Sequence, residues 1–336
     1  MLNKAYIDLN AIEENALKIK ERLNHGVKFC AVVKADAYGH GAVEVASRLY
    51  NICDYFAVAL VEEGISLRLG GIDKPILVLI PPFDEDLERA IYYGLTLAVQ
   101  DGQTIRKIND FCKGLGANAK VHVKVNTGMN RLGAEVGELD EILRVANRCK
   151  RVFVEGVFSH FGNPQDVKSL SLALDKFLLA KRVVKRYNNK VIAHVSASGG
   201  FLQGVQMDMV RIGIMLYGYK PFESGSISLR PAMKVTAPVV CKRNINKGDS
   251  ALYGKCVSDE DLTVAITRFG YADGLFRKHT GCEFNNRCMD LTAIKSDENV
   301  ECVIMENAEQ TAKRYGTISY EILCGASRRA QKIYIR

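Results

Sequence analysis

Residues 29–41 read Phe-Cys-Ala-Val-Val-Lys-Ala-Asp-Ala-Tyr-Gly-His-Gly, and this stretch indicates how the first part of the chain folds. The apolar run Phe29–Val33 predicts a buried strand, which ends at Lys34 and a glycine-containing turn. A lysine that leaves a buried strand keeps few water contacts, so its amine loses a proton more easily than a solvated one. A neutral amine is a nucleophile toward carbonyl groups. A lone lysine here would more often extend its charged end into water, so its neighbours decide between the two interpretations.

Further apolar, β-branched runs follow, as expected of strands buried on both faces. The predicted strands are Phe29–Val33, Tyr55–Leu60, Pro75–Ile80, Leu95–Val99, Lys120–Val125, Val154–His160, Val191–Val195 and Met209–Ile214. Helical patterns accompany them at Ala11–Leu23, Asp84–Tyr93 and Ser169–Tyr187, the first with Asn10 placed as its N-cap. Eight strand–helix units predict an α/β fold, a (β/α)8 TIM barrel. The alternative, a doubly wound open sheet, ordinarily has fewer strands and a Gly-x-Gly-x-x-Gly turn, which the sequence lacks.

After Pro231 the pattern changes to short strands with Asp, Asn and Gly turns between them. The predicted strands are Val235–Val240, Leu262–Thr267, Val300–Ile304 and Ile333–Ile335, with one helix near Ala308–Tyr315. Strands in tandem predict a smaller, mostly β C-terminal domain. We therefore expect residues 1–232 to form the barrel and residues 233–336 to form the β-rich domain.

Composition narrows the class of protein. The formal net charge of +8 is modest and no long Lys/Arg block occurs, which argues against a nucleic-acid partner. The longest apolar run, Ile76–Pro82, is too short to span a membrane. Ten cysteines without a Cys-x-x-Cys pair, and no signal peptide before the first strand, favour the reducing cytoplasm. We expect no metal site.

Polar groups follow several of the predicted barrel strands, whose carboxyl ends meet on one rim, where barrel active sites lie. These groups are Lys34, Lys124–Gly133, Ser159-His160, Ser196–Gly200 and Arg211–Ile214. Each is unremarkable alone, but together they predict a single site.

The lysine segment resembles the segment that binds pyridoxal phosphate (PLP) in alanine racemases, which are fold type III enzymes. Five further segments are similar to family motifs in the same order: Lys124–Gly133, Asp208–Gly218, Phe269–Gly274, Cys288–Asp290 and Thr317–Cys324. The resemblance covers nearly the whole chain. It implies a PLP-dependent isomerase that converts L-alanine to D-alanine for peptidoglycan synthesis.

The resemblance also implies a two-base mechanism. Lys34 would hold PLP and exchange the substrate α-proton on one face, and Tyr271 would act on the opposite face. Tyr271 would come from the other subunit of a homodimer with shared active sites. A free tyrosine has a pKa near 10, so it needs a hydrogen-bond network, in which the resemblance places His160 and Arg211. Arg211 also matches the residue facing the pyridine nitrogen, and a protonated arginine would leave that nitrogen without a proton.

Other roles are carried over in the same way. The cofactor-binding residues would be Lys34, Tyr38, His160, Ser198, Arg211, Gly213 and Ile214, of which Tyr38, Ser198 and the amides of Gly213 and Ile214 would bind the phosphate. Arg131 would bind the substrate carboxylate, and Lys124 matches a lysine that is often carbamylated and then steadies this arginine. Met289 would contact the pocket entrance, which Tyr253 and Asp290 would help to shape.

The sequence departs from the family in two main places. The stretch Gly274–Cys288 is shorter than usual, which puts pocket access and dimer tightness in question. Arg328 stands where many members have a tyrosine, and it either turns outward to solvent or recruits a polar substrate group. Asn130 and Ala197 also replace common residues.

Several functions stay open at this point. A serine or broader-specificity amino-acid racemase is suggested by Arg328, and a PLP-binding homologue with weak or no turnover by the shortened stretch. A related decarboxylase would have a longer second domain and an acid in place of Arg211. A non-catalytic PLP carrier would lack the second domain and Tyr271.

Overall fold

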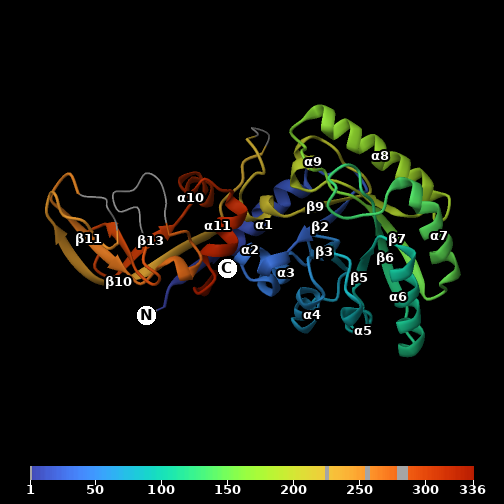
Figure 1. Cartoon of the computed structure of the whole chain (residues 1–336), viewed down its shortest axis with the longest axis horizontal. Helices are drawn as coiled ribbons and strands as arrows, with labels where there is room; N and C mark the ends of the chain where they lie inside the picture. Colours follow the sequence, from blue (N-terminus) through green and yellow to red (C-terminus); the bar gives the residue numbers. More distant parts are fainter. Residues whose placement is uncertain (1, 224–226, 254–257, 278–286) are drawn as a thin grey trace.

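The computed structural model describes residues 2–223, 227–253, 258–277 and 287–336. The chain forms two lobes that lie side by side (Figure 1). The larger lobe contains the blue, green and yellow parts of the chain, and the smaller contains mainly the orange and red parts.

Eight parallel strands form the larger lobe, in the order β8-β7-β6-β5-β4-β3-β2-β9. Their bounds are β2 Lys28–Val32, β3 Tyr55–Val58, β4 Ile76–Val78, β5 Thr96–Val99, β6 Ala119–Lys124, β7 Val152–Phe158, β8 Ile192–His194 and β9 Met209–Ile212. Backbone bonds beside the last two strands bring the edges together, from Asp208 N to Ala193 O and from Arg211 N to Ser196 O, both at 3.0 Å. This confirms the predicted barrel, because an open doubly wound sheet would not follow chain order around a ring.

The barrel helices are α3 Ala42–Leu49, α4 Val61–Leu69, α5 Asp84–Tyr92, α6 Gly102–Leu115, α7 Leu139–Arg148 and α8 Val167–Lys185. Several strands consist only of buried residues, for example β3, β4, β5 and β9. Because both faces of these strands are buried, their sequences are continuous apolar runs.

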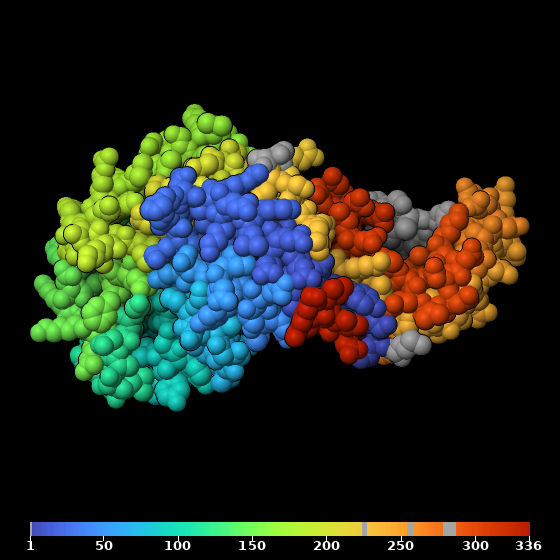
Figure 2. All heavy atoms as spheres, turned by 180° about the vertical axis from the view of Figure 1, so that it is seen from behind, coloured from blue at the N-terminus to red at the C-terminus, as the bar shows by residue number. Residues whose placement is uncertain are grey.

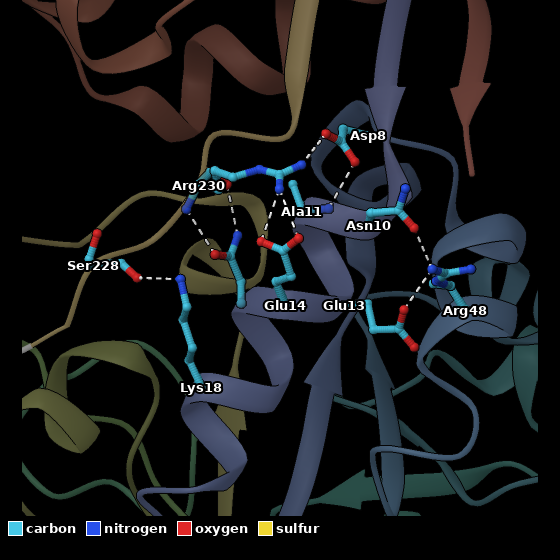
Figure 3. A network of polar contacts seen from close by, with 10 residues as sticks. Asp8, Asn10, Ala11, Glu13, Glu14, Lys18, Arg48, Ser228 and Arg230 are labelled. Carbon is cyan, nitrogen blue, oxygen red and sulfur yellow. Dashed lines mark hydrogen bonds and ion pairs between the residues drawn. The ribbon is translucent and has the colours of Figure 1, made fainter.

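Helix α1 (Leu9–Lys20) begins earlier than predicted. Its cap is Asp8, whose carboxylate accepts from Ala11 N at 2.8 Å, and not Asn10, which instead accepts from Arg48 (Figure 3). Arg230, which precedes the second lobe, donates to Asp8 and to Glu14. Figure 3 shows these contacts joining the start of α1 to the segment that enters the second lobe. The ion pairs therefore fix the junction between the lobes.

The second lobe contains a six-stranded sheet in the order β12-β11-β10-β1-β14, with β13 also paired to β10. The bounds are β1 Lys4–Asp8, β10 Met233–Ile245, β11 Leu262–Thr267, β12 Thr292–Lys295, β13 Glu301–Met305 and β14 Gln331–Ile335. The mostly β character of this domain is confirmed. Two helices also lie here, α10 Ala308–Tyr315 and α11 Ser319–Ala326, and neither α11 nor β12 is among the elements predicted from the sequence.

The first strand of the chain lies in this second sheet. β1 is antiparallel to β10 and parallel to β14, so the two ends of the chain pair with each other. Figure 2 shows the dark-blue first residues against the red last residues between the lobes. Residues 4–8, which the prediction included in the barrel range 1–232, thus belong to the sheet of the second lobe, while the boundary between residues 232 and 233 stays a prediction. Across the described ranges, no helix is long and apolar enough to cross a membrane.

Candidate active site

A cavity of about 580 Å³ opens at the carboxyl ends of the barrel strands. Its lining includes many of the predicted site residues, namely Lys34, Tyr38, Lys124, Arg131, His160, Ser198, Arg211, Gly213 and Ile214. They come from the ends of β2, β6, β7, β8 and β9 or from the turns that follow these strands. The parallel arrangement gathers them because all these strands point the same way around the ring.

Lys34 begins an unusual turn, labelled α2 (Lys34–Gly39). Four consecutive residues, Ala35 to Tyr38, have φ of 52–53° and form a left-handed turn. This conformation costs roughly 1–2 kcal/mol for each L-residue, so its surroundings must hold it. Glu63 accepts from Ala35 N at 2.6 Å, and Asp36 accepts from Ala42 N at 2.8 Å and pairs with Lys332 at 2.8 Å.

The environment of Lys34 lowers the pKa of its amine. Burial is the main cause, and the nearby positive charge of Arg131 is the second. A larger fraction of the amine is therefore neutral, and able to act as nucleophile or base, than in a solvated lysine.

Hydroxyl and amide groups cluster at one end of the cavity. Gly213 N donates to Ser198 Oγ at 3.3 Å. A Cβ on Gly213 would lie 2.5 Å from Tyr38 Oη, so only glycine allows the tyrosine hydroxyl to approach this backbone. The ring of Tyr38 lies 4.9 Å from that of Tyr217, centroid to centroid, and burial raises the pKa of Tyr38. The phenol is therefore protonated and can donate.

Arg211 lines the cavity and is itself buried. Its guanidinium donates to His194 Nδ1 at 2.7 Å, to Ser159 O at 2.6 Å and to Val195 O at 3.2 Å. Burial lowers the pKa of Arg211 to about 10, which still leaves it protonated near neutral pH. The structure thus holds one fixed positive charge at the centre of the barrel.

Two further nitrogen groups, Lys124 and His160, face the cavity. Lys124 Nζ donates to Leu79 O at 2.9 Å, and burial together with Arg131 lowers its pKa to about 8. His160 has a pKa lowered to about 3, first by burial and then by Arg211, so it is neutral. Arg131 itself is an exposed residue at the cavity wall.

Four of the predicted site residues are not among those that line the cavity: Tyr253, Tyr271, Met289 and Asp290. All four belong to the second lobe and are exposed. Tyr271 N donates to Cys288 O and Ala272 N to Met289 O, both at 3.0 Å, so the two loops form one unit. Arg329 braces this unit through Asp290 at 3.1 Å and Asp273 at 3.5 Å.

Some residues at the cavity are not among the predicted site residues. Tyr320 and Cys324, on α11, line it. Tyr320 lies 5.9 Å from Tyr38 between ring centroids, and burial raises its pKa to about 12. The segment Thr317–Cys324 was noticed only as a motif. Its place at the site depends on the packing of α11 against α2, which a linear pattern does not reveal.

Arg328 is exposed and is not among the cavity-lining residues. The shortened stretch Gly274–Cys288 falls largely on residues 278–286, outside the described residues.

Known proteins resemble this chain along its whole length. Residues 7–221 match the family model described as alanine racemase, N-terminal domain, and residues 232–334 match alanine racemase, C-terminal domain. An alanine racemase of Treponema denticola is 34% identical over 99% of this chain and 98% of its own length. One of Staphylococcus epidermidis is 33% identical over 98% of this chain and 93% of its own length.

The comparison with solved structures agrees with the comparison of sequences. The alanine racemase of Clostridium difficile has a TM-score of 0.92 at 34% identity, covering 100% of this chain and 96% of that one. The alanine racemase of Bacillus anthracis with bound L-Ala-P has a TM-score of 0.88 at 28% identity, and the match covers 99% of this chain and 95% of that one. The two family models match both parts of the chain in order, and the chain belongs to the alanine racemase family.

Proposed function

We propose that this protein is a PLP-dependent alanine racemase, which interconverts L-alanine and D-alanine and so supplies D-alanine for peptidoglycan. The observation that carries the proposal is the cavity itself. It combines the amine of Lys34, a cluster of hydroxyl and amide donors and the buried guanidinium of Arg211 in a member of the alanine racemase family.

The donor set fits PLP. Lys34 would bind the aldehyde, because its lowered pKa favours the neutral amine. Tyr38, Ser198 and the amides of Gly213 and Ile214 would bind the phosphate, and Gly213 leaves room for an anion where a Cβ would crowd Tyr38. When bound, PLP supplies a conjugated ring that spreads the negative charge left by the departing α-proton. Arg211 would face the ring nitrogen and leave it unprotonated.

The proton transfers would use two bases. Lys34 Nζ would take the α-proton, or return it, on one face of the substrate. Tyr271 of the partner subunit would do so on the other face, in a homodimer with shared active sites. The exposure of Tyr271, and its absence from the cavity lining of its own chain, support this arrangement.

Substrate binding would depend on Arg131, which can hold a carboxylate with two parallel hydrogen bonds. We further propose that Lys124 is carbamylated: its neutral amine adds to carbon dioxide, forms an N–C bond and releases one proton. Burial is the main cause of the lowered pKa of Lys124 and the charge of Arg131 is the second, and the negative charge of the carbamate would replace the repulsion from Arg131 by attraction. Met289, Tyr253 and Asp290 of the partner subunit would shape the entrance. A ¹³C signal acquired from labelled bicarbonate, and absent in Lys124→Met, would report the carbamate.

The alternative of a serine or broader-specificity racemase depended on Arg328 reaching the pocket. Arg328 is exposed and lines no part of its own chain's cavity, and the relatives that are 33–34% identical over nearly the whole chain are alanine racemases, which favours alanine. The eight cysteines in the described part of the chain are free, which supports the proposal that the protein works in a reducing compartment, the cytoplasm.

The test is a screen of L-amino acids for D-product, with and without added PLP. We expect D-alanine to form fastest and the purified protein to absorb visible light as lysine-bound PLP does. Lys34→Ala should abolish both the absorbance and the activity, while Lys28→Ala, at the far end of the same strand, should keep them. A protein that binds PLP but forms no D-amino acid would show that turnover has been lost. A colourless protein would refute PLP binding itself.

A further inference from the structure

The Gly39-His40-Gly41 sequence forms part of the lysine segment, but none of its residues lines the cavity. It directly follows the left-handed turn of Ala35–Tyr38. A left-handed run of non-glycine residues persists only where neighbouring groups hold it. The contacts around His40 show which groups do so.

His40 is fully buried and binds this turn directly. Its Nδ1 lies 2.9 Å from Ala37 O and 3.0 Å from Tyr38 O. Both partners are carbonyl oxygens, which only accept, so the nitrogen that faces them must carry the proton. Burial lowers the pKa of His40 to about 4, so the ring is neutral and this is its only N–H. Its Nε2 has no partner among the described residues.

The ring of His40 also packs against the barrel. It stacks on Tyr217, with centroids 4.5 Å apart and planes at 27°. Tyr217 donates from its hydroxyl to Val32 O at 3.0 Å, at the last residue of β2, two positions before Lys34. The two stacked rings of His40 and Tyr217 thus connect the barrel strand before Lys34 with the turn after it.

The flanking glycines let the C-terminal segment close over this site. Gly39 has φ of 82° and Gly41 has φ of 95°. A Cβ on Gly39 would lie 2.5 Å from Ser327 Oγ, and Ser327 donates to Gly39 O at 2.9 Å. A Cβ on Gly41 would collide with the hydroxyl of Tyr334. The close cover keeps water from competing for the carbonyls that His40 binds.

We propose that His40 is a positioning residue for the PLP site: its Nδ1–H holds the carbonyls of Ala37 and Tyr38 and thereby fixes the left-handed turn that presents Lys34 and Tyr38 to the cavity. This inference rests on the proposed function. It extends that function by assigning pre-organisation of the lysine and of a phosphate-binding hydroxyl to a residue that touches neither substrate nor cofactor.

Two substitutions separate the hydrogen bond from the packing. His40→Phe keeps a ring against Tyr217 but removes the donor. His40→Asn loses the ring but places an amide N–H close to the position of Nδ1. If the hydrogen bond fixes the turn, His40→Phe should weaken PLP binding by about tenfold, and His40→Asn by clearly less. A role in packing alone would reverse this order.

The measurements use the full chain. PLP is removed, the dissociation constant is measured by titration of the visible absorbance, and amide hydrogen exchange of residues 34–41 is followed with and without PLP. Thermal unfolding shows whether each variant folds. We expect His40→Phe to remain folded, to bind PLP about tenfold more weakly and to exchange these amides faster. The inference is overturned if His40→Phe binds PLP as tightly as the wild type, or if both variants lose affinity equally. Failure of the wild type to bind PLP would instead refute the proposed function.

Discussion

Arg211 donates to His194 Nδ1 over 2.7 Å, and this contact fixes the protonation of a buried row of side chains. Because arginine only donates, His194 Nδ1 must accept, and the proton of this ring is therefore on Nε2. That N–H points to His122 Nδ1, 2.7 Å away. His122 in turn directs Nε2–H toward Glu155 at 3.3 Å. The hydrogen bonds of this row all run in one direction, from the charge of Arg211 at the cavity through His194 and His122 to the carboxylate of Glu155.

Replacing His194 by phenylalanine should misplace Arg211. The substitution removes the only side-chain acceptor in this set of contacts and leaves three carbonyl acceptors. A hydrogen bond to a charged group contributes about 1.5–3 kcal/mol, so we expect kcat/KM to fall by about tenfold or more. Steady-state kinetics and PLP titration measure the effect. His25→Phe, at an exposed position, serves as the control, and unchanged kinetics in His194→Phe would contradict the prediction.

Tyr271→Phe should separate the two faces of the reaction. It removes the hydroxyl that is proposed to transfer the second proton and leaves Lys34 in place. We expect α-proton exchange in deuterium oxide to continue for one alanine enantiomer and to fall by at least about a hundredfold for the other, followed by NMR on each enantiomer separately. Tyr92→Phe, at an exposed tyrosine on α5, is the control. Equal losses of α-proton exchange for both enantiomers would contradict the two-base mechanism.

If the active sites are shared between the two subunits of a dimer, mixing two inactive variants should restore activity. Lys34→Ala and Tyr271→Ala should each be inactive as homodimers. In a mixed dimer, one of the two sites combines the intact Lys34 of one chain with the intact Tyr271 of the other. Random mixing makes half of the dimers mixed, so activity should recover to about a quarter of the wild-type value. If each chain completes its own site, co-refolded mixtures will stay inactive.

Stability should fall as the solution becomes acidic, in part because of His40. Its folded pKa of about 4 lies below the unfolded value of 6.5, mainly through burial; the hydrogen bonds to the Ala37 and Tyr38 carbonyls and the charge of Asp36 oppose the shift, and Lys332 adds to it. The unfolded chain therefore binds the extra proton first, and stability is lost as the pH falls from about 6.5 toward 4. Between pH 7 and pH 5 this histidine alone should remove about 2 kcal/mol of unfolding free energy. Urea unfolding at both pH values checks this, and His40→Asn should show a correspondingly smaller loss.

Local sequence patterns were sufficient to predict the barrel and most of the polar residues at the carboxyl ends of its strands. Most of the barrel strands read as apolar runs because both of their faces are largely buried, and polar residues after several of these runs mark the strand ends. Lys34, Lys124, His160 and Arg211 could be assigned to one site for this reason alone. Helix α1 was placed too late, because Asp8 and Asn10 are both good caps and only the contact with Arg48 shows that Asn10 is engaged elsewhere.

The pairing of β1 with β10 and β14 could not be read in the same way. Its partners lie more than two hundred residues away in the sequence, and a short alternating strand carries no information about which sheet receives it. For the same reason, the position of Tyr320 could not be predicted from the sequence. This residue reaches the cavity only because α11 packs on the turn after Lys34.

The sequence by itself determined the order of strands and helices, the lysine that follows the first barrel strand and the polar groups at the strand ends, because these depend on periodicity and residue type within a few positions. Only the tertiary structure decided that Ala35–Tyr38 turn left-handed, that His40 binds their carbonyls and that Tyr271 is exposed outside its own chain's cavity. These features depend on contacts between distant segments, whose combined stabilisation outweighs what each segment prefers alone.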